Sequence, residues 1–210
     1  NSISMRLQLR RLTTNESNKL NFQLNRSMRI VFFFLCSVLA SCGNDVRVKP
    51  DAKLRLEYPP GNYERMDADC SYSFIKNDLA TLKKNKNCGM NLVYPKMQAT
   101  IYLTYQKIQN NNIDSLLYDA QKLAYDHILK AESIPEQPYV NPDKEVYGMF
   151  YSINGNAASQ SHFYVTDSLN HFVSGSLYFK AKPNFDSIYP AVVYLREDIR
   201  KLMETIEWKN

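Results

Sequence analysis

Residues 145–180, EVYGMFYSINGNAASQSHFYVTDSLNHFVSGSLYFK, contain the pattern that decides the fold class. Apolar or aromatic residues alternate there with polar ones, which is the period of a half-buried strand. The alternating segments are 145–153, 157–166 and 171–180. Asn154-Gly155 between the first two is a strong hairpin signal, and residues 167–170 form a turn by composition. The stretch therefore predicts a three-stranded antiparallel meander.

The same period appears on the N-terminal side of the meander. Residues 99–106 alternate and predict a further strand. Asn110-Asn111-Asn112 then supplies an N-cap for a helix that ends by Pro135. The apolar stripe of this helix comprises Ile113, Leu116, Leu117, Ala120, Leu123, Ala124 and Ala131.

A second helix is predicted after the meander. Pro190 suits its first turn, where the missing amide donor costs nothing. The residues expected on its buried side are Val192, Leu195, Ile199, Leu202 and Ile206. Those expected to face away are Glu197, Asp198, Arg200, Lys201 and Glu204. The predicted order of elements is therefore β-α-β-β-β-α.

The region before this core has the pattern of irregular β structure. Its strand candidates are 54–58, 71–75 and 90–94, with residues 83–86 as an exposed basic loop. Helices that cover an antiparallel sheet make an α+β domain. We expect a single α+β domain at residues 54–210, in which two helices cover the sheet and a disulfide ties the N-terminal β region.

The segment 28–41 is typical of a secretory signal, with one basic residue, a short apolar core and then small residues. Leu39-Ala40-Ser41-Cys42 resembles the bacterial lipobox, in which the cysteine receives diacylglycerol and, after cleavage, a further acyl chain such as palmitate. We expect this covalent lipid on Cys42 and no other cofactor. The alternative is an ordinary cleaved signal with a structural cysteine. Residues 1–27 are expected to be an upstream extension outside the fold, and residues 42–53 the lipidated cysteine and a tether.

Two cysteines remain once Cys36 leaves with the signal and Cys42 carries lipid. Cys70 and Cys88 form an even pair in an exported, oxidising compartment, and we expect a disulfide between them. A metal site built on this pair would need further ligands, and no histidine lies between residues 42 and 126.

The net charge of +5 belongs to the leader. Residues 1–41 hold six basic and one acidic residue, which leaves 20 of each in the rest of the chain. A neutral body excludes nucleic-acid binding by net charge. Gly43, in place of the aspartate of inner-membrane retention signals, favours a periplasm-facing lipoprotein of the outer membrane, with the inner membrane as the alternative.

The chain offers little for catalysis. His127, His162 and His171 are its three histidines, and no local spacing joins them into a metal site. Ser159, His162 and Asp167 do not suit a hydrolytic triad, because a strand would point His162 to the opposite face from the other two. We expect no catalytic residue and no metal.

Tyrosines offer more information. Tyr147, Tyr151, Tyr164 and Tyr178 alternate with smaller residues along the meander. They fit either a core of amphipathic rings or a surface for a protein partner.

Several short motifs carry a resemblance to a known family. They are GNAAS at 155–159, FYVTDS at 163–168, HF at 171–172, Gly175, LYF at 177–179, PN at 183–184, EDI at 197–199 and ETIEW at 204–208. With the lipobox and the cysteine spacing, they resemble GldD, the gliding-motility lipoprotein family of Bacteroidota, over residues 28–210. The resemblance implies a non-catalytic role in gliding motility and the associated type IX secretion system. The implied partners are other lipoproteins or membrane proteins of that machinery.

A partner surface is expected near residues 155–172. The candidate residues are Asn156, Tyr164, Asp167, His171 and Phe172. One alternative function is a periplasmic lipoprotein that binds a small ligand or lipid in an apolar pocket, and the other is a hydrolase.

Overall fold

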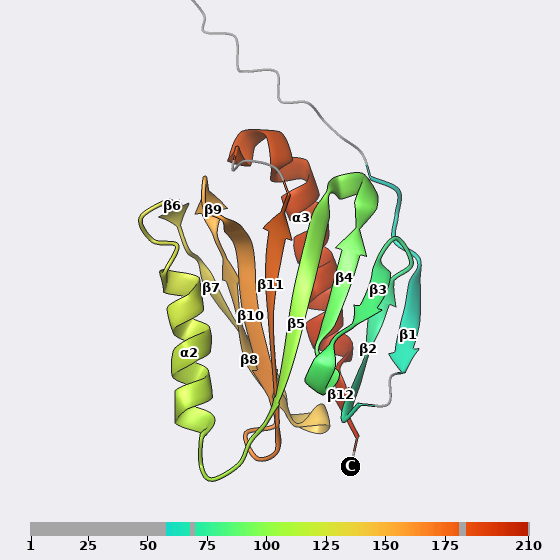
Figure 1. Ribbon diagram of the computed structural model, residues 1–210, viewed down its shortest axis with the longest axis vertical. Coiled ribbons are helices and arrows are strands. Elements are labelled where there is room, and N and C mark those ends of the chain that lie inside the picture. The colour runs from blue at the N-terminus through green and yellow to red at the C-terminus, as the bar shows by residue number, and fades with distance from the viewer. Residues whose placement is uncertain (1–57, 68–69, 181–183, 210) are drawn as a thin grey trace, which may run out of the picture. The chain divides into compact units, whose positions relative to one another are not determined.

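The structure is a computed structural model that describes residues 58–67, 70–180 and 184–209. The predicted leader, Cys42 and the tether lie outside these residues, as does the strand candidate at 54–58 apart from Tyr58. The described residues form antiparallel sheets and two α-helices (Figure 1), which is the α+β class that the sequence predicted.

The largest sheet has seven antiparallel strands. Their spatial order is β3 (Thr81–Lys84), β4 (Met90–Tyr94), β5 (Ala99–Lys107), β11 (His171–Phe179), β10 (Ser159–Thr166), β8 (Val146–Ser152) and β7 (Glu136–Asn141). The predicted meander corresponds to β8, β10 and β11, and the strand predicted before it is β5. Gly175 of β11 lies opposite Leu103 of β5 and Phe163 of β10, and a side chain at Gly175 would collide with the Phe163 ring.

Smaller sheets join segments that are far apart in the sequence. Three strands, β1 (Tyr63–Asp67), β2 (Tyr72–Asn77) and β12 (Glu207–Trp208), pair in that order. The short strands β6 (Ala131–Ser133) and β9 (Asn154–Gly155) pair with each other. Short 3-10 helices lie at Lys86–Cys88, Pro95–Met97 and Pro142–Lys144.

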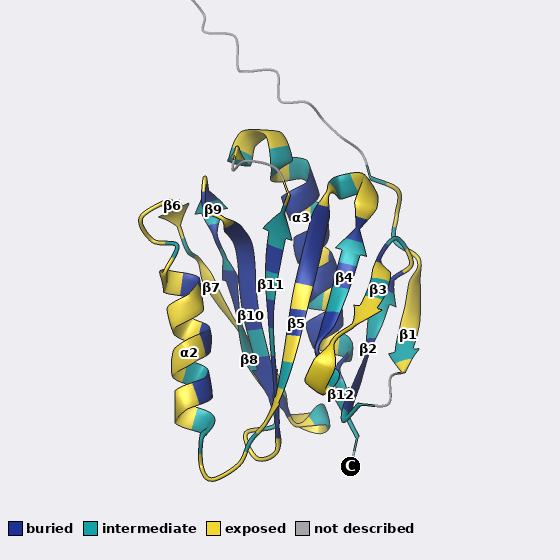
Figure 2. Cartoon of the chain, viewed as in Figure 1, coloured by how far each residue is buried: buried dark blue, intermediate teal, exposed yellow. Residues whose placement is uncertain are grey.

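One helix packs on each face of the seven-stranded sheet. Helix α3 (Phe185–Thr205) contributes Leu195 and Ile199 to the main core, which also contains Val173 of β11. Helix α2 (Ile113–Tyr125) packs instead against Phe172, the preceding residue of the same strand. Neighbouring strand residues point to opposite faces, so the two helices lie on opposite faces. Figure 2 shows that α2 has a broad exposed side.

Helix α2 is shorter than the sequence predicted. It ends at Tyr125, and the next five residues form turns in which the Ile128 and Lys130 N–H groups donate to carbonyls three residues earlier. Ala131, which the helical stripe included, belongs to β6 and pairs with Gly155. With β6 and β7 between α2 and β8, the element order also differs from the predicted β-α-β-β-β-α.

The strands that the sequence did not predict are short, exposed or at sheet edges. In β1, β3 and β7 every residue is exposed or half-buried, so no alternation marks them. Lys83 and Lys84 belong to β3 and not to a loop. The Ser152 N–H of β8 donates to the carbonyl of Pro135, the residue before β7. Hydrogen-bonded and non-hydrogen-bonded pairs alternate along antiparallel strands, so the nitrogen of Pro138 in β7 points away from β8. Pro138 therefore removes no hydrogen bond between β7 and β8. On the outer side of β7 it removes an N–H donor with which another strand could pair.

The predicted hairpin turn at Asn154-Gly155 and the predicted start of the last helix at Pro190 were also wrong. Asn154-Gly155 is not a two-residue hairpin turn, because it pairs with β6 as β9. Gly155 has φ +103°, and a Cβ there would lie 2.8 Å from the Glu132 nitrogen, so the position requires glycine. Pro190 lies inside α3, which begins five residues earlier at Phe185.

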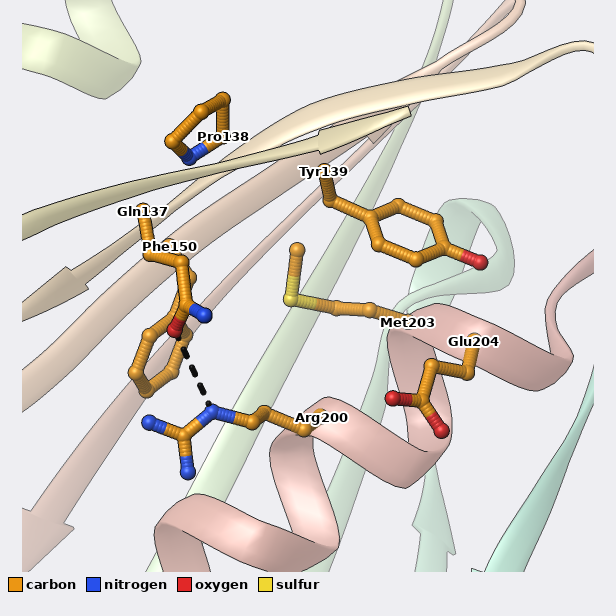
Figure 3. A pocket seen from close by; sticks show the side chains of 7 residues that line it. All are labelled: Gln137, Pro138, Tyr139, Phe150, Arg200, Met203 and Glu204. Atoms are coloured by element: carbon orange, nitrogen blue, oxygen red, sulfur yellow. Dashed lines mark hydrogen bonds between the residues drawn. The ribbon is translucent and has the colours of Figure 1, made fainter. Parts of the chain in front are cut away.

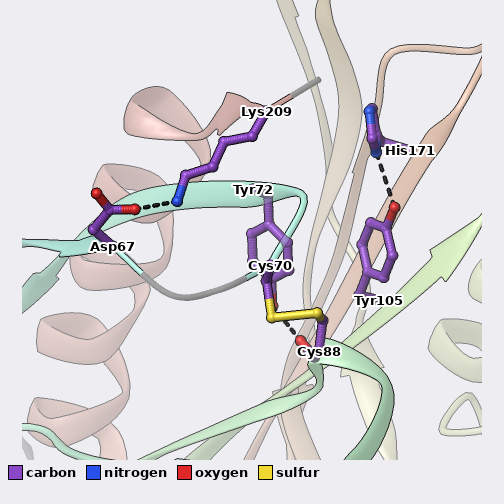
Figure 4. Close-up of a disulfide and its surroundings, with 7 residues drawn as sticks. All are labelled: Asp67, Cys70, Tyr72, Cys88, Tyr105, His171 and Lys209. Carbon is purple, nitrogen blue, oxygen red and sulfur yellow. Dashed lines mark hydrogen bonds and ion pairs between the residues drawn. A yellow bond between two sulfur atoms is a disulfide. The ribbon is translucent and has the colours of Figure 1, made fainter.

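The predicted disulfide between Cys70 and Cys88 is present, with Cα atoms 5.6 Å apart (Figure 4). Beside it, the Tyr72 hydroxyl donates to the Cys88 carbonyl at 2.8 Å. The Tyr72 ring stacks on Tyr105, whose hydroxyl is 2.9 Å from His171 Nδ1. This series of contacts connects the disulfide to the first residue of β11.

Candidate interaction surface

The four tyrosines of the meander lie on the face of the sheet that α2 partly covers. In the strand register, Tyr151 lies opposite His162, and Tyr164 lies opposite Met149 and Ser174. Tyr147 and Tyr178 fall on the same face by alternation. Opposite this face, the strands contribute Phe150, Phe163, Val165 and Leu177 to the core beneath α3. The sequence pattern thus separated the apolar core from a tyrosine-rich face.

Helix α2 is attached to this face by a small apolar cluster. Leu116 and Ala120 pack on Phe172, and the Tyr164 ring stacks on the Phe172 ring at a centroid distance of 5.5 Å. Phe172 is 2% exposed, so its contacts are internal. The residue proposed as an aromatic anchor for a partner thus anchors α2 to the sheet.

Large apolar side chains are exposed on α2, on the turn after it and on the neighbouring strands. They are Tyr118, Leu123, Tyr125, Ile128 and Leu129, together with Tyr102 of β5, Val140 of β7 and Tyr147 of β8. We call these eight residues the α2-side surface. All eight belong to α2, to the turn after it or to strand positions on the same face of the sheet, and exposed apolar patches typically mark interaction sites. Tyr118, Tyr125, Ile128 and Leu129 lie outside the predicted stripe and were the signal in the sequence. Leu123 was predicted to lie on the buried stripe, but it is 48% exposed.

Histidines lie where the α2 turn meets the sheet. The His127 ring stacks on His162 with centroids 5.4 Å apart, and Tyr178 meets His162 edge-on. His162 Nδ1 is 2.7 Å from the Ser176 hydroxyl, while its Nε2 is buried without a hydrogen-bond partner. Burial, and then the charge of His127, lower the pKa of His162 to about 4. The pair is therefore packed in its neutral form at neutral pH.

The five predicted partner residues do not form one patch. Asn156 lies before β10 and Asp167 follows it, so eight strand residues, roughly 26 Å, separate them. Asn156 is exposed, and its Oδ1 accepts a hydrogen bond from the Phe185 N–H and so caps α3. Tyr164 is half-buried against Phe172.

Asp167 and His171 build the turn between β10 and β11. Asp167 Oδ1 accepts hydrogen bonds from three backbone N–H groups, those of Leu169, Asn170 and His171. Burial of Asp167 raises its pKa, but these three donors outweigh it and lower the pKa overall. The His171 ring is buried and stacks on Trp208 at 5.2 Å. Both side chains thus have structural partners within the domain.

Two buried charges on α3 were not predicted. The Arg196 guanidinium donates to the carbonyls of Ile153 and Gln160, both at 3.0 Å, and to Asn154 Oδ1. Burial lowers the pKa of Arg196 to about 10, so it remains cationic at neutral pH. Its donors satisfy one carbonyl just after β8 and one near the start of β10, and so hold both strand ends on the helix.

Asp198 was predicted to face away from the core, but it is 5% exposed. Its carboxylate accepts hydrogen bonds from the Tyr63 hydroxyl at 2.7 Å, the Tyr94 hydroxyl at 3.0 Å and the Asn77 amide. Burial raises its pKa, an effect that these donors oppose. The carboxylate thereby connects α3 to β1, β2 and β4.

A small hollow separates α3 from the edge strand β7 (Figure 3). The Arg200 guanidinium lies over the Phe150 ring at 5.1 Å, and its Nε is 3.4 Å from Gln137 Oε1. The hollow measures about 70 Å³, which is far below the roughly 300 Å³ of ordinary ligand pockets. Arg200 thus serves to hold the edge strand to the helix.

Ser159, His162 and Asp167 are each hydrogen-bonded to other groups than one another. The Ser159 hydroxyl donates to the carbonyls of Ser161 and Leu177, and His162 is paired with Ser176. Within residues 58–67, 70–180 and 184–209, no three His, Cys, Asp or Glu side chains are grouped as a metal site. In the same ranges no helix has the length and hydrophobicity needed to cross a bilayer.

Comparison with models of known protein families gives a match. The model of a family described as "Gliding motility lipoprotein GldD" matches residues 43–208. No curated protein and no solved structure matches the chain.

Proposed function

This chain belongs to the family of the gliding motility lipoprotein GldD, and from that premise we propose that it is a non-catalytic, membrane-tethered binding component of the motility machinery and its associated type IX secretion system. Its role is to hold another protein of that machinery, a lipoprotein or a membrane protein, at the membrane. The premise supplies the motility and the membrane anchor, and the α2-side surface supplies the means of binding.

We place the anchor at Cys42. The family match begins at Gly43, the residue directly after the lipobox cysteine. A chain that is cleaved before Cys42 would keep the whole matched region. Residues 43–57 separate the anchor from the first described residue, and fifteen residues extend at most about 54 Å. The domain thus remains near the membrane, and Gly43 favours the periplasmic side of the outer membrane.

The observation that carries the binding role is the α2-side surface. Tyr118 is 65% exposed and Ile128 is 61% exposed, although the domain has a complete core without them. Tyrosine is enriched among the few residues that provide most of the affinity at protein interfaces, and burial of a neighbouring apolar side chain adds to it. Because the body has equal numbers of acidic and basic residues, apolar contacts and not net charge would drive binding.

The α2-side surface can be tested by crosslinking in native host cells. The double variant Tyr118→Ser/Ile128→Ser removes two anchors, and Val193→Ser is the matched control, since Val193 is exposed on α3. We expect the double variant to recover at most about one tenth of the partner that the wild type recovers, and the control to recover the same amount as the wild type. Full recovery by the double variant, with its fold intact, would show that the interface lies elsewhere.

The anchor needs its own arm of the experiment. In Cys42→Ala cells, we expect the protein to leave the membrane fraction and the partner yield to fall. A Cys42→Ala protein that remains in the membrane fraction would contradict lipidation at this residue. The two arms are independent, because the double variant keeps the anchor and Cys42→Ala keeps the α2-side surface.

A further inference from the structure

An apolar pocket opens where the chain enters the described fold. Its volume is about 260 Å³, and the residues that line it are Tyr58, Pro59, Leu79, Thr81, Tyr94, Pro95, Lys96 and Met97. This volume exceeds the roughly 150 Å³ of a cavity that binds benzene and approaches the size of small-ligand sites. It can therefore accept several methylene groups of an aliphatic chain.

The walls of the pocket are fixed by hydrogen bonds that lead to Asp198. Tyr94 donates to Asp198, and so does Asn77, whose Oδ1 accepts from the Leu79 N–H at 3.0 Å. The Asn77 amide also donates to the Tyr194 hydroxyl at 2.9 Å. These bonds hold two walls, Leu79 and Tyr94, in place without a ligand.

The remaining wall is held by Tyr194. Its hydroxyl donates to the Pro59 carbonyl at 3.0 Å, and its ring packs on Tyr58 at 5.3 Å. A preformed pocket costs less ordering free energy on binding than one that must assemble. The buried carboxylate of Asp198, which plays no part in the α2-side surface, thus acts as a positioning residue for this pocket.

The chemistry of the lining indicates the occupant. Six of the eight lining residues are apolar or aromatic, and Lys96 is the one charged residue among them. An apolar chamber with a cation beside it matches an acyl chain that carries an anionic head group. A membrane phospholipid has such a head group, whereas the diacylglycerol on Cys42 has no phosphate. The charge therefore favours a lipid of the surrounding membrane over the anchor of the protein itself.

We propose that this pocket binds one acyl chain of an anionic membrane phospholipid, with Lys96 beside the phosphate. The proposal rests on the membrane anchor of the proposed function and not on the α2-side surface. The bound chain would hold the domain against the bilayer in a fixed orientation, which the tether alone cannot do. It would thereby determine in which direction the α2-side surface is presented to a partner.

The test uses the full lipidated protein in nanodiscs of phosphatidylethanolamine and phosphatidylglycerol that include phosphatidylglycerol with a photoreactive group in its acyl chain. After irradiation, mass spectrometry locates the labelled peptides. We expect label on residues 79–97. Met97→Trp fills the pocket and should lower this label about tenfold, the effect of displacing two buried methylenes. Leu169→Trp places the same ring in the exposed turn between β10 and β11 and should leave the label unchanged.

A second variant tests the head group without filling the pocket. Lys96→Gln should lower the labelling by phosphatidylglycerol about threefold, as expected for an exposed ion pair. It should lower the labelling by photoreactive phosphatidylethanolamine less, because the ammonium of that head group already neutralises its phosphate. Equal labelling of Met97→Trp and wild type, or label confined to other exposed apolar residues, would overturn the proposal. The lipid label reports on the pocket alone, and Tyr118→Ser/Ile128→Ser keeps the pocket, so this double variant should be labelled like the wild type. A failure of the pocket is therefore distinguishable from a failure of the α2-side surface.

Discussion

The two faces of the seven-stranded sheet are each covered by one helix, but to different extents. Helix α3 has 21 residues and α2 has 13, so their lengths are about 31 and 20 Å. Beneath α3, side chains such as Val165 and Leu177 are completely buried. On the α2 side, Tyr102 remains 45% exposed.

This difference separates the parts of the molecule that maintain the fold from those that are free to bind. The α3 face contains the main core and both buried charges of the helix. Among the described residues, the apolar cluster on the α2 side is small, and Tyr102, Tyr118 and Tyr147 on that side contact solvent. Substitutions on the α3 face should therefore affect stability, and substitutions on the α2 side should affect binding.

The largest effect is expected from Leu195→Ala. Leu195 is fully buried between α3 and the sheet, so its truncation leaves a cavity and should lower the free energy of unfolding by about 4 kcal/mol. Val193, two residues away, is exposed, and Val193→Ala should change the same quantity by less than about 0.5 kcal/mol. Urea unfolding followed by circular dichroism measures both. Equal effects would remove the basis for treating α3 as the structural face.

The next largest effect is expected from loss of the disulfide. Cys70 and Cys88 are 18 residues apart, and opening a loop of that size costs about 3 kcal/mol through the entropy of the unfolded chain. The bond connects the segment before β2 to that before β4, and both strands contribute to the core beneath α3. Thermal unfolding of Cys70→Ser/Cys88→Ser should occur at a lower midpoint than in the wild type. Reductant should lower the midpoint of the wild type alone; a midpoint shared by both proteins without reductant would contradict the prediction.

The apolar side of α3 was predicted correctly from the sequence, but the burial of its charged residue Asp198 was not, for an identifiable reason. Asp198 lies three residues after Leu195 and four before Leu202, which places it on the buried stripe. The spacing along the helix therefore indicated that Asp198 is buried. The groups that make burial possible, Tyr63 and Tyr94, lie more than 100 residues earlier in the chain. No local pattern reveals such partners, and an acidic residue without a visible partner is normally assigned to the surface.

The candidate surface was predictable in type and not in position. The sequence showed that the tyrosines of the meander alternate with smaller residues, because strand alternation is local, but it left open whether they form a core or a surface. Phe172 was proposed as a partner anchor because nothing local indicates which half of that face α2 covers. The polar edge strands were missed for a related reason: an edge residue has little to bury, so its sequence shows no period.

The smallest expected effect is the pH dependence of stability, which has opposite signs for the buried titratable groups on the two faces. His162 on the α2 side takes up a proton at about pH 4 in the folded chain and near 6.5 in the unfolded chain. The unfolded chain thus binds more protons between these values, and the stability due to His162 is lost as the pH falls through that window. Asp198 on the α3 side has a raised pKa, so its contribution is present below its unfolded value and is lost as the pH rises through its folded value.

The two signs are separable by variants. Between about pH 7.5 and about pH 5.5, the advantage of the wild type over His162→Gln in unfolding free energy should shrink by about 1 kcal/mol. Over the same range, its advantage over Asp198→Asn should remain constant or grow. Urea unfolding of the three proteins at each pH measures both differences. If both differences change in the same direction, the two buried groups do not titrate as their surroundings dictate, and the contrast between the faces would have to rest on packing alone.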